Sequence, residues 1–240
     1  MCKWTMVKAP LPLRILRSGF RALVDPRHRH RMIRFHLTKG RAFQPSDRTR
    51  PNRYPRIFRF VQERLGAGSD VRILSFGCST GEEVFSLRHY FANARIHGID
   101  IDAPSIATCR KQLAAHPDPR ISFTVADSVA NEPDGAYDAI FCMAVLRDGR
   151  LNARDTQRCD PLLDFADFAK IIADFARCLR PGGLLTVVSS NFRLSDTACA
   201  PLFRPVFRRN IDIQTPVFGP DNRRIEGETC FDAVFERIQL

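Results

Sequence analysis

Short apolar runs alternate with segments of helical periodicity from residue 71 to residue 189, and this alternation restricts the fold most strongly. The predicted strands are residues 71–76, 95–101, 121–126, 137–143 and 184–189, and the predicted helices are residues 80–91, 103–115 and 165–179. Each strand is too short to be a helix, and each helix has an apolar face. Strands and helices that alternate at this spacing form a mainly parallel sheet with helices on both faces.

The segments that flank this core have different patterns. Residues 55–65 predict a helix that starts at Pro55 and ends before Gly66, with an apolar stripe of Ile57, Phe58, Val61 and Leu65. Residues 211–218 and 229–238 are strand-like and are joined through the turn-forming residues 219–222. We expect residues 229–238 to pair in the antiparallel direction at the end of the sheet.

A glycine-containing turn links the first predicted strand to the first predicted helix of the alternating core. Gly77 and Gly81 flank Cys78, Ser79 and Thr80, so the backbone can turn tightly and a ligand can approach it. In a doubly wound sheet, the carboxyl end of the first strand is where a nucleotide-like ligand binds. The spacing is neither a dinucleotide fingerprint nor a phosphate loop, because Ser79 replaces the central glycine and no Gly-Lys pair follows.

Two carboxylates begin the following helix and indicate the charge of that ligand. Glu82 and Glu83 would repel a pyrophosphate but attract a cationic group. This disfavours NAD and ATP, and it favours S-adenosylmethionine, which carries a sulfonium and an amino group.

Carboxylates also follow the second and third predicted strands. Asp100 ends the second strand, where it can accept hydrogen bonds from a ribose diol, and Asp102 can instead cap the next helix. Asp127 follows the third strand, where it can accept a hydrogen bond from an adenine amino group. One such carboxylate alone would indicate a solvated loop, but several in register with the glycine turn indicate a cofactor site.

The sequence from Val71 to Glu83 resembles motif I of the class I S-adenosylmethionine-dependent methyltransferases, and its variant is similar to the chemotaxis-receptor (CheR-type) branch. Later motifs of that family have counterparts here in the same order. They are Ile101 with its acidic neighbours, Asp127 with Ser128, residues 137–146 and residues 179–184. The resemblance implies a Rossmann-like, seven-stranded, mainly parallel sheet with one antiparallel strand near the C-terminus. The cofactor-binding residues that it implies are Gly77, Cys78, Ser79, Thr80, Gly81, Glu82, Asp100, Ile101, Asp127, Ser128 and Met143.

The sequence defines the methyl acceptor less well than the cofactor. Receptor methyltransferases carry Arg-Asn where this chain has Met143 and Ala144, so a receptor glutamate is disfavoured as the acceptor. A small-molecule, carboxylate or hydroxyl acceptor is favoured over nucleic acid. The polar segment 189–196 follows the fifth strand and can line a substrate pocket or be a solvated loop. Tyr54, Asp148 and Asp196 are candidates for a base near the cleft, but no catalytic residue is assigned, and no metal site is expected.

Positive charge is concentrated in the first third of the chain. Residues 1–72 carry a net charge of +14, whereas the whole chain carries +11. We therefore predict a basic extension over residues 1–53 and the cofactor-binding domain over residues 54–240. Residues 13–24 can form an amphipathic helix that packs on the domain or lies on a membrane surface. The basic extension could attract an anionic acceptor.

The alternative function is a non-catalytic S-adenosylmethionine-binding or nucleic-acid-associated protein, although direct nucleic-acid binding is disfavoured because no recognition motif is found. The sequence leaves the oligomeric state open.

Eight cysteines are present, and none has a partner at metal-binding spacing. Several lie in apolar segments, so we expect reduced core residues and a cytoplasmic location.

Overall fold

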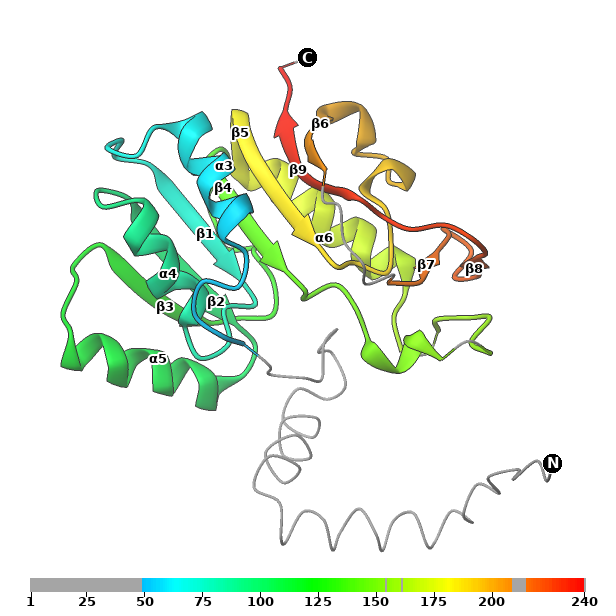
Figure 1. Cartoon of the computed structure of the whole chain (residues 1–240), viewed down its shortest axis with the longest axis horizontal. Coiled ribbons are helices and arrows are strands. Elements are labelled where there is room, and N and C mark those ends of the chain that lie inside the picture. Colours follow the sequence, from blue (N-terminus) through cyan, green and yellow to red (C-terminus); the bar gives the residue numbers. More distant parts are fainter. Residues whose placement is uncertain (1–48, 154, 161, 209–214, 240) are drawn as a thin grey trace, which may run out of the picture. The chain divides into compact units, whose positions relative to one another are not determined.

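The computed structural model describes residues 49–153, 155–160, 162–208 and 215–239 (Figure 1). Its helices are α3 (Pro55–Leu65), α4 (Glu82–Tyr90), α5 (Ala103–Ala115) and α6 (Phe165–Cys178), with 3-10 turns η1 (Gly149–Asn152), η2 (Leu194–Asp196) and η3 (Ala200–Leu202). Its strands are β1 (Arg72–Phe76), β2 (Arg95–Asp100), β3 (Ile121–Val125), β4 (Tyr137–Met143), β5 (Leu179–Val188), β6 (Phe203–Arg208), β7 (Val217–Phe218), β8 (Arg224–Ile225) and β9 (Asp232–Arg237).

Seven of these strands form one twisted sheet in the order β3-β2-β1-β4-β5-β9-β6. Strands β1 to β5 pair in parallel, whereas β9 is antiparallel to both β5 and β6. The expected Rossmann-like sheet with one antiparallel strand near the C-terminus is therefore confirmed. Because parallel strands all point the same way, their carboxyl ends form one edge, which we call the carboxyl edge.

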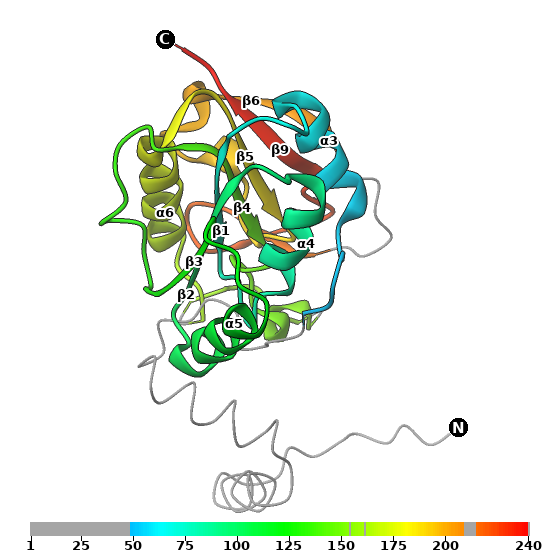
Figure 2. The same ribbon diagram turned by 90° about the vertical axis from the view of Figure 1, so that its left-hand side faces the viewer.

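Helices cover both faces of the sheet, as Figure 2 shows with α6 on one side and α3 and α4 on the other. Successive residues of each buried strand serve opposite cores. Ile73 and Phe141 pack with α3, α4 and α5, whereas Leu74 and Ile140 pack with α6. Both faces of β4 are buried along its whole length, which explains its continuous apolar run from Ala139 to Met143.

The helix α3 was predicted with its observed limits. Its buried residues are Ile57, Phe58 and Val61, and Gly66 ends it with φ of +86°. Phe58 makes edge-to-face contacts with Tyr90 and Phe141, at ring-centroid distances of 5.5 and 5.7 Å. These contacts attach α3 to α4 and to the centre of the sheet.

Two predictions about the later strands were wrong in detail. Residues 229–238 were expected at the end of the sheet, but β9 lies between β5 and β6 (Figure 1). The turn at residues 219–222 joins β7 to β8 in a separate two-stranded sheet, with Val217 opposite Ile225, and does not lead directly into β9. Strand β6 was not predicted, because Pro205 and two arginines interrupt its apolar pattern; an outer strand tolerates proline.

The predicted helix 13–24 and most of the predicted extension 1–53 lie outside the described residues, so the domain boundary at residue 53 stays a prediction. Within the described part of the chain, no helix is long and apolar enough to cross a membrane.

Candidate functional site

The chain turns sharply where β1 meets the carboxyl edge. The backbone N–H groups of Gly77 and Cys78 both donate to the carbonyl oxygen of Ile99, at 2.7 and 3.0 Å. Gly77 has φ of +75°, and a Cβ there would lie 2.4 Å from Cγ2 of Val145. Only glycine satisfies both the torsion and the close approach. The turn therefore fixes β1 against β2 and against the loop that follows β4.

Asp100 holds the next part of this turn. Its Oδ2 accepts the backbone N–H of Ser79 at 2.8 Å, and its Oδ1 accepts the backbone N–H of Asp102 at 2.8 Å. Ser79 adopts φ of +51°, which is uncommon for a residue with a side chain, and its Oγ is buried without a hydrogen-bond partner. A strained residue with an unsatisfied buried hydroxyl at a strand end is typical of a ligand site.

Asp102 has the capping role that the sequence allowed. Its Oδ2 accepts the backbone N–H of Ser105 at 3.0 Å at the start of α5. Asp100 and Asp102 thus have different positions: the first joins two loops at the site, and the second stabilises a helix end.

Gly81 completes the turn at the start of α4. It has φ of +94°, and a Cβ there would lie 2.9 Å from the ring of Phe85 and 3.1 Å from Sγ of Cys109. Cys109 donates to the carbonyl oxygen of Ser79 at 3.2 Å. A hydrogen bond with Cys109, together with burial, raises the pKa of the Cys78 thiol, so these two thiols pack the turn from beneath.

The two glutamates of α4 have different environments. Both oxygens of Glu82 accept from Oγ1 of Thr80, at 2.8 and 2.7 Å. Glu83 is partly buried, accepts from Oγ of Ser75 at 2.8 Å, and has a pKa raised to about 7 because loss of solvent around the carboxylate penalises its charge. Glu83 can therefore gain or lose a proton near neutral pH, and a cation beside it would favour the ionised form.

The remaining expected residues lie at neighbouring strand ends. Ala126 donates its N–H to the carbonyl oxygen of Asp100 at 3.1 Å, so Asp127 and Ser128 follow β3 beside the end of β2. Ile101 and Ser128 are partly exposed and Asp127 is exposed, whereas Met143 is 8% exposed and packs in the core beneath α3 and α4. Positive φ angles follow β4 at Ala144 (+60°) and β5 at Ser189 (+56°).

Comparison with known proteins identifies this arrangement. Residues 73–183 match a family described as a methyltransferase domain. These residues include β1 to β4 and the whole of the glycine turn.

These residues, slightly under half of the chain, are assigned by similarity to a methyltransferase domain. Its strand order and fold are those of class I, and the expected cofactor, S-adenosylmethionine, is confirmed with this assignment. The similarity to the chemotaxis-receptor branch stays a prediction.

The relatives of the methyltransferase domain have different names. The chain is 30% identical to a demethylmenaquinone methyltransferase from Thermus thermophilus over 49% of this chain and 46% of that protein. It is 32% identical to a tRNA1(Val) (adenine(37)-N6)-methyltransferase from Phocaeicola vulgatus over 52% of this chain and 55% of that protein. A solved Haemonchus contortus phosphoethanolamine N-methyltransferase with S-adenosylmethionine has 19% identity and a TM-score of 0.42, covering 57% of this chain and 28% of that one. The chain spans about half the length of the curated relatives it matches.

Both acidic candidates for a base, Asp148 and Asp196, are held in ion pairs. Asp148 is 1% exposed and accepts from Nε of Arg150 at 3.0 Å. Asp196 accepts from Nε of Arg193 at 3.0 Å. Tyr54 lies directly before α3, with the guanidinium of Arg53 5.2 Å from its ring centroid.

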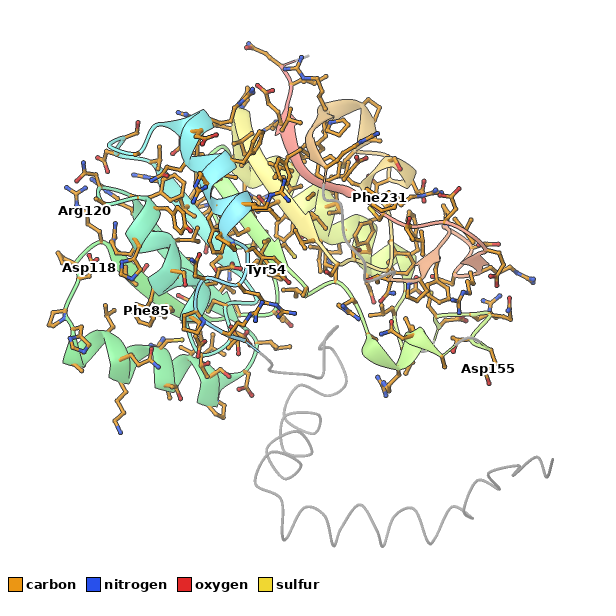
Figure 3. All side chains as sticks on the ribbon, viewed as in Figure 1. Tyr54, Phe85, Asp118, Arg120, Asp155 and Phe231 are labelled. Carbon is orange, nitrogen blue, oxygen red and sulfur yellow. The ribbon has the colours of Figure 1, made fainter. Side chains whose placement is uncertain are left out.

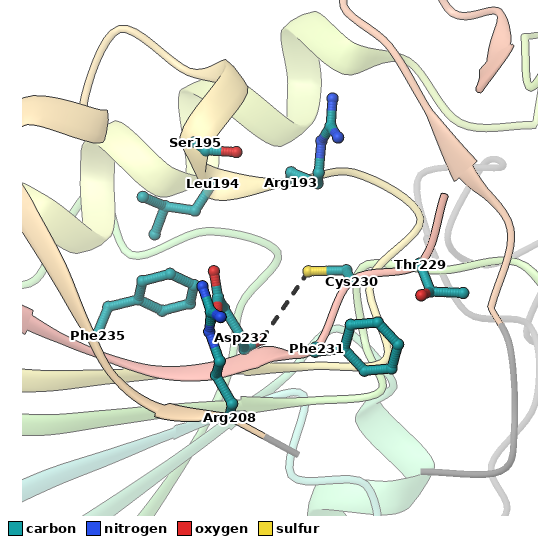
Figure 4. A pocket seen from close by; sticks show the side chains of 9 residues that line it. All are labelled: Arg193, Leu194, Ser195, Arg208, Thr229, Cys230, Phe231, Asp232 and Phe235. Atoms are coloured by element: carbon teal, nitrogen blue, oxygen red, sulfur yellow. Dashed lines mark hydrogen bonds and ion pairs between the residues drawn. The ribbon is translucent and has the colours of Figure 1, made fainter. Parts of the chain in front are cut away.

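A pocket of about 440 Å³ lies where β6 ends and β9 begins (Figure 4). It is lined by Arg193, Leu194, Ser195, Arg208, Thr229, Cys230, Phe231, Asp232 and Phe235. The predicted polar segment 189–196 therefore contributes three residues to a pocket. Phe231 is 47% exposed and presents an aromatic ring beside it (Figures 3 and 4).

Sequence reasoning missed Arg147 and the part that Asn191 plays. Asn191 is fully buried: it donates its N–H to the carbonyl oxygen of Leu146 at 3.0 Å, and its Oδ1 accepts the N–H of Asp148 at 2.8 Å. Its Nδ2 donates to the carbonyl oxygen of Pro216 at 2.8 Å. This asparagine joins the loops after β4 and β5. A polar residue two positions past an apolar strand was the available signal, but it does not distinguish such a role from a solvated loop.

The described cysteines are free, and most are buried in the two cores. Within the same residues, no group of three metal-binding side chains comes together.

Proposed function

We propose that this chain is an S-adenosylmethionine-dependent methyltransferase that acts on a small molecule. The observation that supports the activity most directly is the glycine turn inside residues 73–183, where the buried Oγ of Ser79 has no partner. A cofactor seated there would give that hydroxyl a hydrogen bond.

The residues present fit a cationic nucleoside. Gly77 to Gly81 would hold the methionine portion, with Glu82 or Glu83 near its amino group. Asp100 and Ile101 would hold the ribose, and Asp127 with Ser128 the adenine. Met143 would border the methyl group.

Bound S-adenosylmethionine supplies a methyl group on a positively charged sulfur, and the acceptor takes this methyl in line while the carbon–sulfur bond breaks. The protein has to align the acceptor with that methyl and exclude water. The backbone of the turn, which Asp100 fixes, gives such alignment without a catalytic side chain. An acceptor that loses a proton would need a base, and no residue is assigned to that role.

The pocket supports a small-molecule acceptor. Met143 pairs with Val188 across β4 and β5, and β5 pairs with β9, which begins at Asp232 beside the pocket. Because neighbouring strands lie about 4.8 Å apart, the pocket starts about 10 Å along the carboxyl edge from Met143. Its volume is in the range of metabolite sites. Two relatives have names that specify small acceptors, demethylmenaquinone and trans-aconitate.

Calorimetry tests the cofactor. We expect S-adenosylmethionine and S-adenosylhomocysteine to bind and NAD not to bind, with affinity reduced in Asp100→Ala. Binding of NAD without S-adenosylmethionine would overturn the proposal.

A labelled-methyl transfer screen over metabolite extracts tests the acceptor. Ser195→Trp fills the pocket without touching the glycine turn, so we expect it to abolish labelling of the acceptor while S-adenosylhomocysteine still binds. Unchanged labelling would place the acceptor elsewhere.

An RNA acceptor is the alternative. The match to a tRNA methyltransferase and the net charge of +14 over residues 1–72 favour it. Label recovered in the RNA fraction of the same screen would establish this alternative in place of the small-molecule acceptor.

The cytoplasmic location and the membrane-surface role of residues 13–24 remain predictions. Binding of the whole chain to anionic vesicles, weakened by salt, would support the membrane role.

A further inference from the structure

Arg147 lies between the glycine turn and the pocket. It follows Val145, whose side chain covers Gly77, and its own N–H donates to the carbonyl oxygen of Val145 at 2.8 Å. The residues on both sides of Arg147, Leu146 and Asp148, are hydrogen-bonded to Asn191. Arg193, which lines the pocket, is two residues beyond Asn191. Arg147 is therefore fixed on the part of the carboxyl edge that an acceptor must cross to reach Met143.

The side chain of Arg147 is partly buried and unsatisfied. Its Nε is buried and has no hydrogen-bond partner. Across the described ranges, no carboxylate is recorded within 4.0 Å of its guanidinium, whereas exposed arginines such as Arg158 and Arg204 have such partners. A buried donor without a partner costs about 1–3 kcal/mol, and more when it is charged. An anionic ligand that accepts from this Nε would remove that cost.

The adjacent carboxylate does not complete it. Asp148 accepts from Nε of Arg150 with both oxygens at 3.0 Å and also accepts the backbone N–H of Arg150 at 2.8 Å. Asp148 therefore binds Arg150, which lies in η1, and leaves the Arg147 guanidinium without a close counter-ion in the described structure.

The charged and polar groups around Arg147 have opposing effects on its guanidinium. Burial lowers its pKa most, and the charge of Arg53 lowers it further, while Tyr54 and Asp148 act in the opposite direction. The charge of Arg53 also lowers the pKa of Glu83, so Arg53 is near both groups. An anionic group on a ligand would supply the counter-ion that the partly buried Arg147 guanidinium lacks.

We propose that Arg147 binds an anionic group, a carboxylate or a phosphate, on the methyl acceptor and thereby selects acidic metabolites. This inference rests on the proposed methyltransferase activity and specifies its substrate class. Arg147 is a specificity-determining residue, and Arg53 adds positive charge beside it.

The experiment compares three proteins: wild type, Arg147→Gln and Arg95→Gln. Arg95 lies at the amino end of β2, 60% exposed and 3.8 Å from Asp70, so its substitution removes the same charge from the opposite edge of the sheet. First, each protein is loaded with S-adenosylhomocysteine and titrated calorimetrically with inorganic phosphate and with succinate at constant ionic strength. We expect binding of at least one anion to weaken about tenfold or more in Arg147→Gln and to remain unchanged in Arg95→Gln.

Second, a metabolite extract is divided by anion exchange and each fraction is offered with labelled S-adenosylmethionine. We expect label in the retained, acidic fraction, reduced about tenfold or more in Arg147→Gln and partly restored in Arg147→Lys. Calorimetry with S-adenosylhomocysteine should give equal affinities for all the proteins, which shows that the variants are folded.

Several results would overturn the inference while the methyltransferase activity stands. Label in the neutral, cationic or RNA fraction would exclude an acidic metabolite. Equal anion binding by wild type and Arg147→Gln would exclude the role of Arg147. Loss of S-adenosylhomocysteine affinity in Arg147→Gln would show that the guanidinium holds the cofactor carboxylate. Failure of wild type to bind S-adenosylhomocysteine would instead refute the proposed function itself.

Discussion

The two edges of the parallel strands differ in how well their polar groups are satisfied. At the amino edge, Asp138 accepts the N–H of Arg72 at 2.6 Å and the guanidinium of Arg180 at 2.7 Å, and Asp70 lies within 3.8 Å of two arginines. Arg88 at the same edge has a buried Nε and Nη2 without a hydrogen bond, but it forms an ion pair with Asp118 at 2.7 Å. At the carboxyl edge, Ser79 and Arg147 contain buried polar atoms without partners, and non-glycine residues have positive φ angles. The amino edge is organised for stability, whereas the carboxyl edge keeps strain and unsatisfied groups that a ligand would relieve.

Substitution of Gly77 is expected to have the largest effect. In Gly77→Ala, the new Cβ would meet Val145 at 2.4 Å with φ of +75°, so we expect a loss of stability of about 1–3 kcal/mol and a loss of cofactor affinity of about 100-fold. Gly182→Ala is the control, because Gly182 has φ of +77° at the amino edge and open space around it. Chemical denaturation and calorimetry measure both quantities. If Gly182→Ala lost as much cofactor affinity as Gly77→Ala, the proposed functional difference between the two edges would be wrong.

Two buried carboxylates offer the next comparison. Asp100 and Asp138 are 3% and 8% exposed, and each accepts a backbone N–H. We expect Asp100→Asn and Asp138→Asn each to lose about 1–3 kcal/mol of stability, because a charge-assisted hydrogen bond is weakened. Only Asp100→Asn should also reduce cofactor affinity, by about 10- to 100-fold. Normal S-adenosylhomocysteine binding by Asp100→Asn would remove Asp100 from the site.

Glu83 is expected to make both stability and binding depend on pH. Its pKa rises from 4.5 to about 7 in the folded protein, because burial penalises the carboxylate. The stability that this proton provides is fully present below pH 4.5 and is lost as the pH rises to about 7. In Glu83→Gln, we therefore expect a ligand-free protein that is about 2–3 kcal/mol more stable than wild type at pH 8 and little changed at pH 4.

The same variant should bind the cofactor less well. The carboxylate attracts the cofactor's amino group only when ionised, so wild-type affinity should fall about tenfold between pH 8 and pH 6 and stay constant in Glu83→Gln. A parallel pH dependence in both proteins would show that another group titrates.

Removal of a single hydroxyl should have the smallest effect. Ser79 and Thr186 each contain a buried hydroxyl without a partner, the first at the carboxyl edge and the second inside β5. We expect Ser79→Ala and Thr186→Val to keep or gain stability within about 1 kcal/mol. Only Ser79→Ala should weaken cofactor binding, by about three- to tenfold. If Thr186→Val weakened it equally, the effect would come from the core.

The elements that depend on local sequence pattern could be predicted from the sequence. Strands β1 to β4, the helix α5 and the turn at Gly77 follow from periodicity, glycine placement and the position of Asp100, because each is determined within about 30 residues. The helix at residue 165 was expected to reach Leu179 but ends at Cys178, and Leu179 already belongs to β5. This shift is small because helix ends depend on the following chain as well as on propensity.

Non-local properties were not predictable. The place of β9 depends on which strand edge remains available after β5 has paired with β4, and the alternation of residues in β9 does not contain that information. Arg147 appears in the sequence as one charged residue of a loop. Its importance comes from the burial of its Nε without a partner and from the engagement of Asp148 by Arg150, which only tertiary structure establishes.

The position of β9 also determines the order in which the sheet can be assembled during synthesis. Strand β6 leaves the ribosome before β9, yet among the described residues its one neighbour in the sheet is β9. Until residues 232–237 have been made and have docked on β5, β6 has no strand to join, and the edge of β5 stays open to pairing with other chains. The five parallel strands and the glycine turn can form earlier. The pocket between β6 and β9 is therefore built after the parallel part of the sheet, and chains that stall before residue 232 would display a cofactor fold with an aggregation-prone edge.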